Sequence, residues 1–96
     1  MFACYILHSA SKDKFYIGFV QDSIESRLQK HNAGFYDNTY TSFATDWVLY
    51  LLIECENSHQ AICLEKHIKR MKSKEYIRNL KKYPEMISKL LENYRT

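Results

Sequence analysis

The chain has 96 residues and a net charge of +3, with 46% hydrophobic and 26% charged residues, the mixture of an ordinary soluble globular domain. Only two Gly and one Pro occur, which argues against disordered and repeat architectures. No apolar run approaches the ~20 residues of a membrane span, and the N-terminus lacks a basic segment followed by an apolar one. We therefore expect residues 1–96 to form a single cytoplasmic domain.

The charge is distributed unevenly along the chain. Residues 1–65 carry four Lys and Arg against eight Asp and Glu, whereas residues 66–96 carry ten against three. A basic C-terminal third predicts a polyanionic partner, but Lys-rich amphipathic helices that need a water-facing side explain the same composition. Composition alone leaves both explanations open.

The three cysteines, Cys4, Cys55 and Cys63, are an odd number and predict reduced thiols rather than a disulfide framework. His59, Cys63 and His67 are spaced four residues apart, so a helix would align them on one face as candidate zinc ligands. No CxxC pair accompanies them, and ligands spread over two helical turns diverge too far for one ion. We therefore favour the interpretation without zinc.

Residues 2–9 and 14–20 are short apolar and aromatic runs separated by a polar segment, which predicts a β-hairpin. The turn has no Asn-Gly or Asp-Gly signal, so the register rests on the side-chain pattern. We expect Tyr5 to face Tyr16, which makes one face of the hairpin wholly apolar and places two phenols ~5 Å apart on the other. Cross-strand packing is the simpler explanation for such a pair.

A helix should follow, because Asp22 is a good N-cap, Glu25 completes a capping box and Gly34 supplies a stop. On this helix Arg27 and His31 lie four residues apart, at the edge of the buried stripe. A cation beside a titratable imidazole suits phosphate binding and proton transfer, although most such pairs are ordinary surface residues.

Residues 35–46 are polar and aromatic without a period, and they predict a loop long enough to suspect function. Residues 47–55 predict a third strand. Asn57 and Gln60 mark the start of a second helix, which we expect to reach about Lys72.

The inner stripe of that second helix consists of four apolar side chains, Ala61, Leu64, Ile68 and Met71. Glu65 lies within the stripe, where a carboxylate is costly to desolvate unless it is paired or binds a cation. An ion pair with Lys69, one turn later, and a bound metal ion are both adequate explanations.

The remaining chain predicts two more helices, a basic one over residues 74–82 and an amphipathic one over residues 84–96 that opens with Pro84. The apolar side chains of the last helix follow 3.6-residue spacing: Met86, Ile87, Leu90, Leu91 and Tyr94. We expect this stripe to pack on the core, with a dimer surface as the alternative.

Together, these features resemble the GIY-YIG nuclease family over about residues 2–75, and are most similar to its small stand-alone bacterial members and to the nuclease domain of the excision-repair incision enzyme. The segments that carry the resemblance are CYIL (4–7), YIG (16–18), RLQKHNAG (27–34) and CLEKHIKRMK (63–72). The resemblance implies an α+β fold in which a three-stranded antiparallel sheet is flanked by helices in the order ββαβαα, here with a further C-terminal helix.

Matched position by position, the resemblance implies a catalytic set of five residues: Tyr5, Tyr16, Arg27, His31 and Glu65. Glu65 would bind one Mg²⁺ or Mn²⁺ ion, and Tyr5 would deprotonate the attacking water with His31 as its proton acceptor. Tyr16 would position the nucleophile and Arg27 would bind the phosphate, leaving 5′-phosphate and 3′-hydroxyl ends.

Two positions depart from the family pattern. The first motif reads Ala3-Cys4-Tyr5 rather than Gly-Ile-Tyr, although its tyrosine is kept. Ile77 stands where several branches of the family have an asparagine, and Asn79 comes two positions late. The second departure concerns how the substrate is held rather than the chemistry.

The resemblance and the charge distribution imply nucleic acid as the partner, and we expect DNA cut with structural or weak sequence preference. The basic residues expected to attract its backbone are Lys66, Lys69, Arg70, Lys72 and Lys74, followed by Arg78, Lys81 and Lys82. A catalytically silent nucleic-acid-binding domain and a protein-interaction module that uses the last helix are the alternatives. An RNA substrate, the oligomeric state, and repair, mobile-element or restriction roles all stay open.

Overall fold

The computed structural model describes residues 1–33 and 44–95 of the chain. Its elements follow in the order β1 (Phe2–Ser9), β2 (Lys14–Val20), α1 (Ile24–Asn32), β3 (Trp47–Cys55), α2 (Ser58–Met71), α3 (Lys74–Lys82) and α4 (Pro84–Asn93). This order confirms the predicted α+β fold. None of the described helices has the length and apolar character needed to cross a bilayer.

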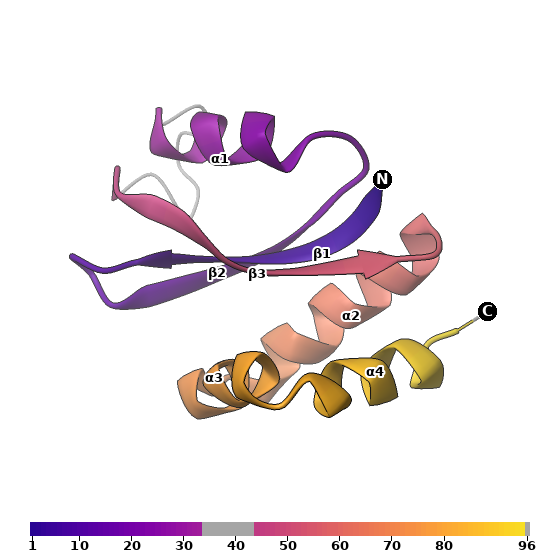
Figure 1. The fold of residues 1–96 in the computed structure, drawn as a ribbon. Helices are drawn as coiled ribbons and strands as arrows, with labels where there is room; N and C mark the ends of the chain where they lie inside the picture. The colour runs from indigo at the N-terminus through magenta and orange to yellow at the C-terminus, as the bar shows by residue number, and fades with distance from the viewer. Residues whose placement is uncertain (34–43, 96) are drawn as a thin grey trace.

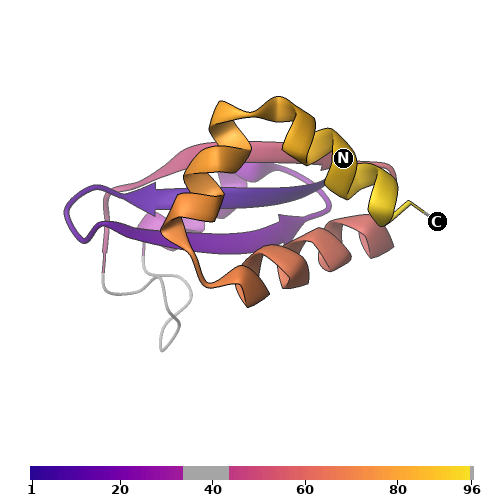
Figure 2. The same ribbon diagram turned by 90° about the horizontal axis from the view of Figure 1, so that it is seen from below.

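The three strands form one antiparallel sheet in the order β2-β1-β3, so β1 is the central strand and β2 and β3 are its edges. Helix α1 covers one face of the sheet, and α2, α3 and α4 cover the other (Figure 1). Figure 2, viewed from the side of the three C-terminal helices, shows them spread across the sheet. Because β1 has helices on both faces, it is buried along nearly its whole length.

The alternation of side chains along β1 divides the interior into two cores. On the side of α2, the buried residues are Cys4, Ile6, Phe15, Ile53, Leu64, Ile68, Ile77, Leu80 and Leu90. On the side of α1, they are Ala3, Tyr5, Leu7, Val20, Ile24, Ala44 and Trp47. The apolar stripe of α4 packs against the first core, which confirms that expectation, whereas Met71 at the end of α2 is 44% exposed and was wrongly assigned to the inner stripe.

The predicted hairpin register was wrong by two residues. Tyr5 stands opposite Gly18, and Tyr16 stands opposite Leu7. The observed register pairs Ser9 with Lys14, which adds residue pairs to the ladder and shortens the turn; Asp13 closes that turn with a φ of 49°. A shift by an even number keeps every side chain on its predicted face, so the two tyrosines still share one side of the sheet.

The helix boundaries follow local capping. Ser23, rather than Asp22, caps α1, because its hydroxyl accepts a hydrogen bond from the backbone N–H of Ser26 at 3.2 Å. Asn57 caps α2 as predicted, through the N–H of Gln60 at 2.9 Å. The predicted stop at Gly34 and most of the predicted loop over 35–46 lie outside the described residues.

Leu64 is fully buried where α2 packs on the sheet, so it offers a test of this packing. We expect Leu64→Ala to lower the free energy of unfolding by about 2–5 kcal/mol, through lost burial and the cavity that remains. Val48→Ala on β3, where Val48 is 55% exposed, should change it by less than about 0.5 kcal/mol. Urea unfolding measures both, and equal losses would contradict the described packing of α2.

Candidate active site

Three of the five predicted catalytic residues meet on the α1 side of the sheet. The Tyr5 hydroxyl of β1 and Nε2 of His31 on α1 are 3.0 Å apart. The Tyr16 ring of β2 lies beside both, with its centroid 6.2 Å from that of Tyr5 and 4.8 Å from that of His31. Tyr5 is 1% exposed and His31 is 3% exposed, whereas Tyr16 is half-buried, so the cluster meets solvent at Tyr16.

Gly18 allows the Tyr5 ring to take this position. A Cβ at residue 18 would lie 2.6 Å from both Cζ and the hydroxyl of Tyr5, and 3.0 Å from the Tyr16 ring. The glycine of the YIG segment is therefore needed for space, because the phenol of the neighbouring strand lies across it.

His31 is held electrically neutral at physiological pH. Burial, with a smaller contribution from the nearby Arg27 guanidinium, lowers the pKa of His31 to about 4. A neutral imidazole has one unprotonated ring nitrogen, and with Nε2 in that state the Tyr5 hydroxyl donates its hydrogen bond to it. The pair is thus arranged for a proton to pass from Tyr5 to His31.

Arg27 lies one turn before His31 on α1 and is half-buried. Within the described part of the chain, its guanidinium forms no ion pair with a carboxylate. A cation that pairs with no described carboxylate, beside a neutral imidazole, provides a binding group for an anion.

Glu65 does not join the phenols directly. It comes from α2, on the opposite side of the sheet, and its carboxylate lies 3.3 Å from the Lys69 ammonium group. Lys69 in turn lies 5.9 Å from the centroid of the Tyr16 ring, so the path from Glu65 to the tyrosines runs around the exposed edge of β2. The sequence left two explanations for the inward Glu65 carboxylate, and the structure shows the ion pair with Lys69.

The chemistry of Glu65 also suits a hydrated divalent cation. Mg²⁺ keeps most of its waters and needs only one or two protein carboxylates in addition to substrate phosphates. The Glu65 side chain is 19% exposed, and Lys69 is 50% exposed and can turn toward solvent or a phosphate. Across residues 1–33 and 44–95, no group of three or more His, Cys, Asp and Glu side chains could enclose a metal ion, so Glu65 would hold one as a single carboxylate.

Of the two histidines that sequence spacing had aligned with Cys63, His67 has other partners and His59 contacts the cysteine. Both ring nitrogens of His67 lie at hydrogen-bond distance from phenols, 3.0 Å from Tyr94 and 3.1 Å from Tyr76. His59 Nε2 lies 3.5 Å from the Cys63 sulfur. His67 thus ties α2 to α3 and α4.

Among the five nucleic-acid-binding residues predicted between positions 66 and 74, Lys69 and Lys74 have carboxylate partners and the other three have none within the described residues. Lys66, Arg70 and Lys72 are exposed and form no ion pair within the described residues. Lys74 instead donates to the backbone carbonyl and the carboxylate of Asp13, at 2.6 and 3.1 Å, and holds the hairpin turn against α3. Lys74 therefore has a structural partner that the sequence did not indicate.

Sequence reasoning also missed Asn32. Its side chain accepts a hydrogen bond from the backbone N–H of Trp47 at 2.7 Å and donates one to the Trp47 carbonyl at 2.9 Å. These two bonds fasten the last turn of α1, with His31 in it, to the first residue of β3. No spacing rule links residues fifteen positions apart, so only the fold reveals this contact.

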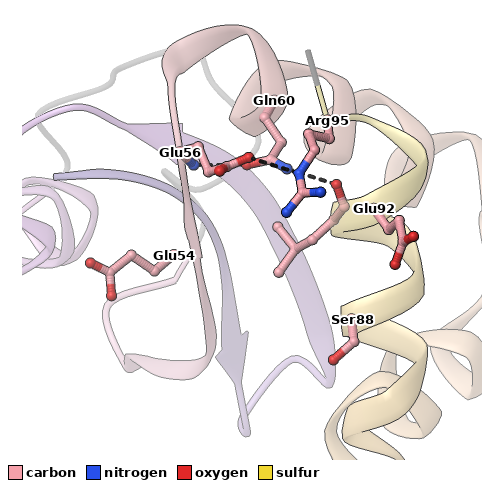
Figure 3. A pocket seen from close by; sticks show the side chains of 7 residues that line it. Glu54, Glu56, Gln60, Ser88, Glu92 and Arg95 are labelled. Atoms are coloured by element: carbon pink, nitrogen blue, oxygen red, sulfur yellow. Dashed lines mark hydrogen bonds and ion pairs between the residues drawn. The ribbon is translucent and has the colours of Figure 1, made fainter.

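A pocket of about 260 Å³ lies away from the tyrosine cluster, between the end of β3 and α4 (Figure 3). Three carboxylates line it, those of Glu54, Glu56 and Glu92, against one guanidinium, that of Arg95, which pairs with Glu56 at 3.6 Å. Its acidic lining disfavours phosphate, and none of the five predicted catalytic residues, all of them described, contributes to it.

Comparison with protein families finds a match to the GIY-YIG catalytic domain over residues 1–83, which ends directly before α4. Comparison with curated proteins found no match, nor did comparison with solved structures. The matched span contains all five residues of the predicted catalytic set.

The low pKa of His31 predicts a pH-dependent stability. Unfolded imidazole has a pKa of ~6.5, so between pH 6.5 and about 4 the unfolded chain binds a proton that the folded chain excludes. The contribution of His31 to stability is therefore complete above pH 6.5 and is lost as the pH falls toward 4. His31→Gln should flatten this slope in urea unfolding, and exposed His59→Gln should leave it unchanged; an unaltered slope in His31→Gln would refute the assignment.

Because the Tyr5 ring lies so close to Gly18, adding one methyl group at residue 18 should destabilise the protein. Gly18→Ala should lower the free energy of unfolding by about 1–3 kcal/mol, because the Tyr5 ring must move away from His31. Urea unfolding measures the loss, and the ultraviolet titration of the tyrosines reports the change around Tyr5. An alanine variant as stable as the parent would contradict the described ring position.

Proposed function

This chain belongs to the GIY-YIG nuclease family, and from that premise we propose that it is a metal-dependent endonuclease that hydrolyses phosphodiester bonds of DNA. The observation that carries the proposal is the 3.0 Å contact between the Tyr5 hydroxyl and a neutral His31, beside Arg27. This contact joins a proton donor to a proton acceptor, and Arg27 adds a cation near them that suits a phosphate.

Tyr5 serves as the general base. Free tyrosine has a pKa of ~10 and is a poor base on its own. As Tyr5 takes a proton from the attacking water, its own proton passes to Nε2 of His31, so no free phenolate has to accumulate. The depressed pKa of His31 keeps the imidazole unprotonated before the reaction, so a ring nitrogen has a lone pair to receive the proton.

Tyr16 and Arg27 hold the reactants. Tyr16 is the member of the cluster that solvent reaches, so its hydroxyl positions the attacking water by hydrogen bonding. Arg27 binds the non-bridging oxygens of the scissile phosphate and neutralises the charge that builds on them. The products carry 5′-phosphate and 3′-hydroxyl ends.

Glu65 would hold the single Mg²⁺ or Mn²⁺ ion, which would supply electrostatic stabilisation of the phosphate and of the departing 3′ oxygen. The Glu65 carboxylate is paired with Lys69, whose half-exposed ammonium group lies beside Tyr16 and would bind a backbone phosphate there.

The exposed cations Lys66, Arg70 and Lys72 supply salt-dependent attraction to the DNA backbone, with little sequence preference. We propose that residues 1–96 act as one nuclease unit, since α4 packs on the same core as α2 and α3. Its three cysteines are free thiols, which suits the reducing cytoplasm, and DNA repair is one of the roles open to such a nuclease.

A second candidate function is nucleic-acid binding without cleavage. The ion pair between Glu65 and Lys69 favours it, because this ammonium group occupies the position that a metal ion would need. The two functions differ in one observable: both bind DNA, but only the first cuts it.

Cleavage of a labelled nicked or branched DNA in Mg²⁺ or Mn²⁺ tests the proposal. Glu65→Gln and Tyr5→Phe should each lower the rate by ~10² or more, since they remove the metal anchor and the general base. Glu54→Gln and Tyr83→Phe are matched controls on exposed residues and should keep the parent rate. Binding without cleavage by the parent would establish the silent domain instead.

A further inference from the structure

A cavity of about 470 Å³ lies along the outer edge of β2, between that strand and the turn that joins α2 to α3. Its apolar wall includes Phe15 and Ile17 of β2 and Ile68 of α2, and Tyr16 forms its end nearest the tyrosine cluster. We call this cavity the edge groove. A smaller hollow of about 210 Å³ shares Phe15 and Ile17 with it and extends it toward the start of β2.

The charge of the edge groove is of one sign. Lys69 and Lys72 line it, Lys14 and Lys74 line its extension, and no Asp or Glu of the described residues lines either part. Lys69 and Lys74 are paired with carboxylates outside the groove, those of Glu65 and Asp13, whereas Lys14 and Lys72 form no ion pair with a described residue. The groove therefore combines an apolar wall with ammonium groups at its rim.

We propose that the edge groove binds an unpaired nucleotide of DNA next to the scissile phosphate. This inference rests on the proposed endonuclease function and names the substrate class that the function leaves open. A nucleotide has the two properties that the groove matches, a base that stacks on apolar and aromatic side chains and a phosphate that ammonium groups attract.

Position supports this occupant over others. Tyr16 belongs both to the tyrosine cluster and to the groove, so a strand whose phosphate lies at the cluster has its neighbouring nucleotide at the groove. The volume lies within the ~300–1,000 Å³ of ordinary small-ligand sites. A base can enter only after it leaves the helical stack, which costs least when it is already unpaired.

The consequence is a preference for DNA that carries an unpaired nucleotide, such as a bulge or a flap. In a continuous duplex the bases stay stacked, and only the backbone reaches the lysines at the rim. The lysines at the rim would then attract any DNA, whereas the apolar wall would favour DNA with an unpaired nucleotide over fully paired DNA.

The test compares two fluorescein-labelled duplexes of equal length, one fully paired and one with a single unpaired adenosine, by fluorescence anisotropy without divalent metal. The parent should bind the bulged duplex about tenfold more tightly. Ile17→Glu places a carboxylate in the groove and should bring the ratio of the two Kd values to about one. Ile17→Leu keeps the apolar wall and should retain the parent ratio.

Val48→Glu is the matched control, because it adds the same charge to an exposed apolar residue on the other edge strand, β3. It should weaken binding to both duplexes equally and preserve the ratio. A parent that binds and cuts DNA but does not distinguish the duplexes would overturn the groove assignment alone. An Ile17→Glu variant with the parent ratio would do the same, while a parent that binds neither duplex would overturn the proposed function as well.

Discussion

The buried hydroxyl of Tyr5 needs a hydrogen-bond partner inside the protein, and the arrangement of the site provides one. A phenol on the central strand of a sheet with helices on both faces must find a hydrogen-bond partner inside the protein, and His31 of α1 lies at 3.0 Å. Together with the packing of Ile24 on the same core, that contact fixes the face that α1 turns toward the sheet, and Arg27 lies one turn before His31. Gly18 on the neighbouring strand has no side chain because the same ring occupies the space.

The residues of the proposed active site come from both faces of the sheet. The proton-transfer pair and Arg27 lie on the α1 face, whereas Glu65 and the lysines of α2 lie on the other. Groups on opposite faces of a sheet meet only at an edge, and β2 is the edge that both reach. Under the proposed function, the substrate phosphate would lie at this edge of the sheet, where residues from both faces can approach it without a deep cleft.

Hydrophobic periodicity and capping residues predicted the order of the elements, since these signals are local and strong. Asn57 capped α2 as expected, but the cap of α1 moved from Asp22 to Ser23, because neighbouring residues of similar capping ability cannot be ranked without the geometry of the turn. The hairpin register failed for a related reason, because the side-chain pattern specifies faces and is satisfied equally by any even shift. Tyr5 and Tyr16 were correctly placed on one face and incorrectly placed opposite each other.

In the candidate site too, features that depend on neighbouring residues could be predicted, and contacts between distant residues could not. The residue types of the five predicted positions were visible in the chain, and the resemblance supplied their grouping. The Lys69 ion pair was recognised as an alternative because it lies one helical turn from Glu65. The contacts of Asn32 with Trp47 and of Lys74 with Asp13 join distant parts of the chain, and no pattern along the sequence specifies them.

The bonds between Asn32 and the backbone of Trp47 have a consequence for the position of His31. They join the last residue of α1 directly to the first residue of β3, although fifteen positions separate the two in the sequence. The end of α1 is therefore held on the sheet by a backbone contact of β3 and not by its helix alone. A change at Asn32 would release this end of the helix and, with it, His31 from its place beside Tyr5.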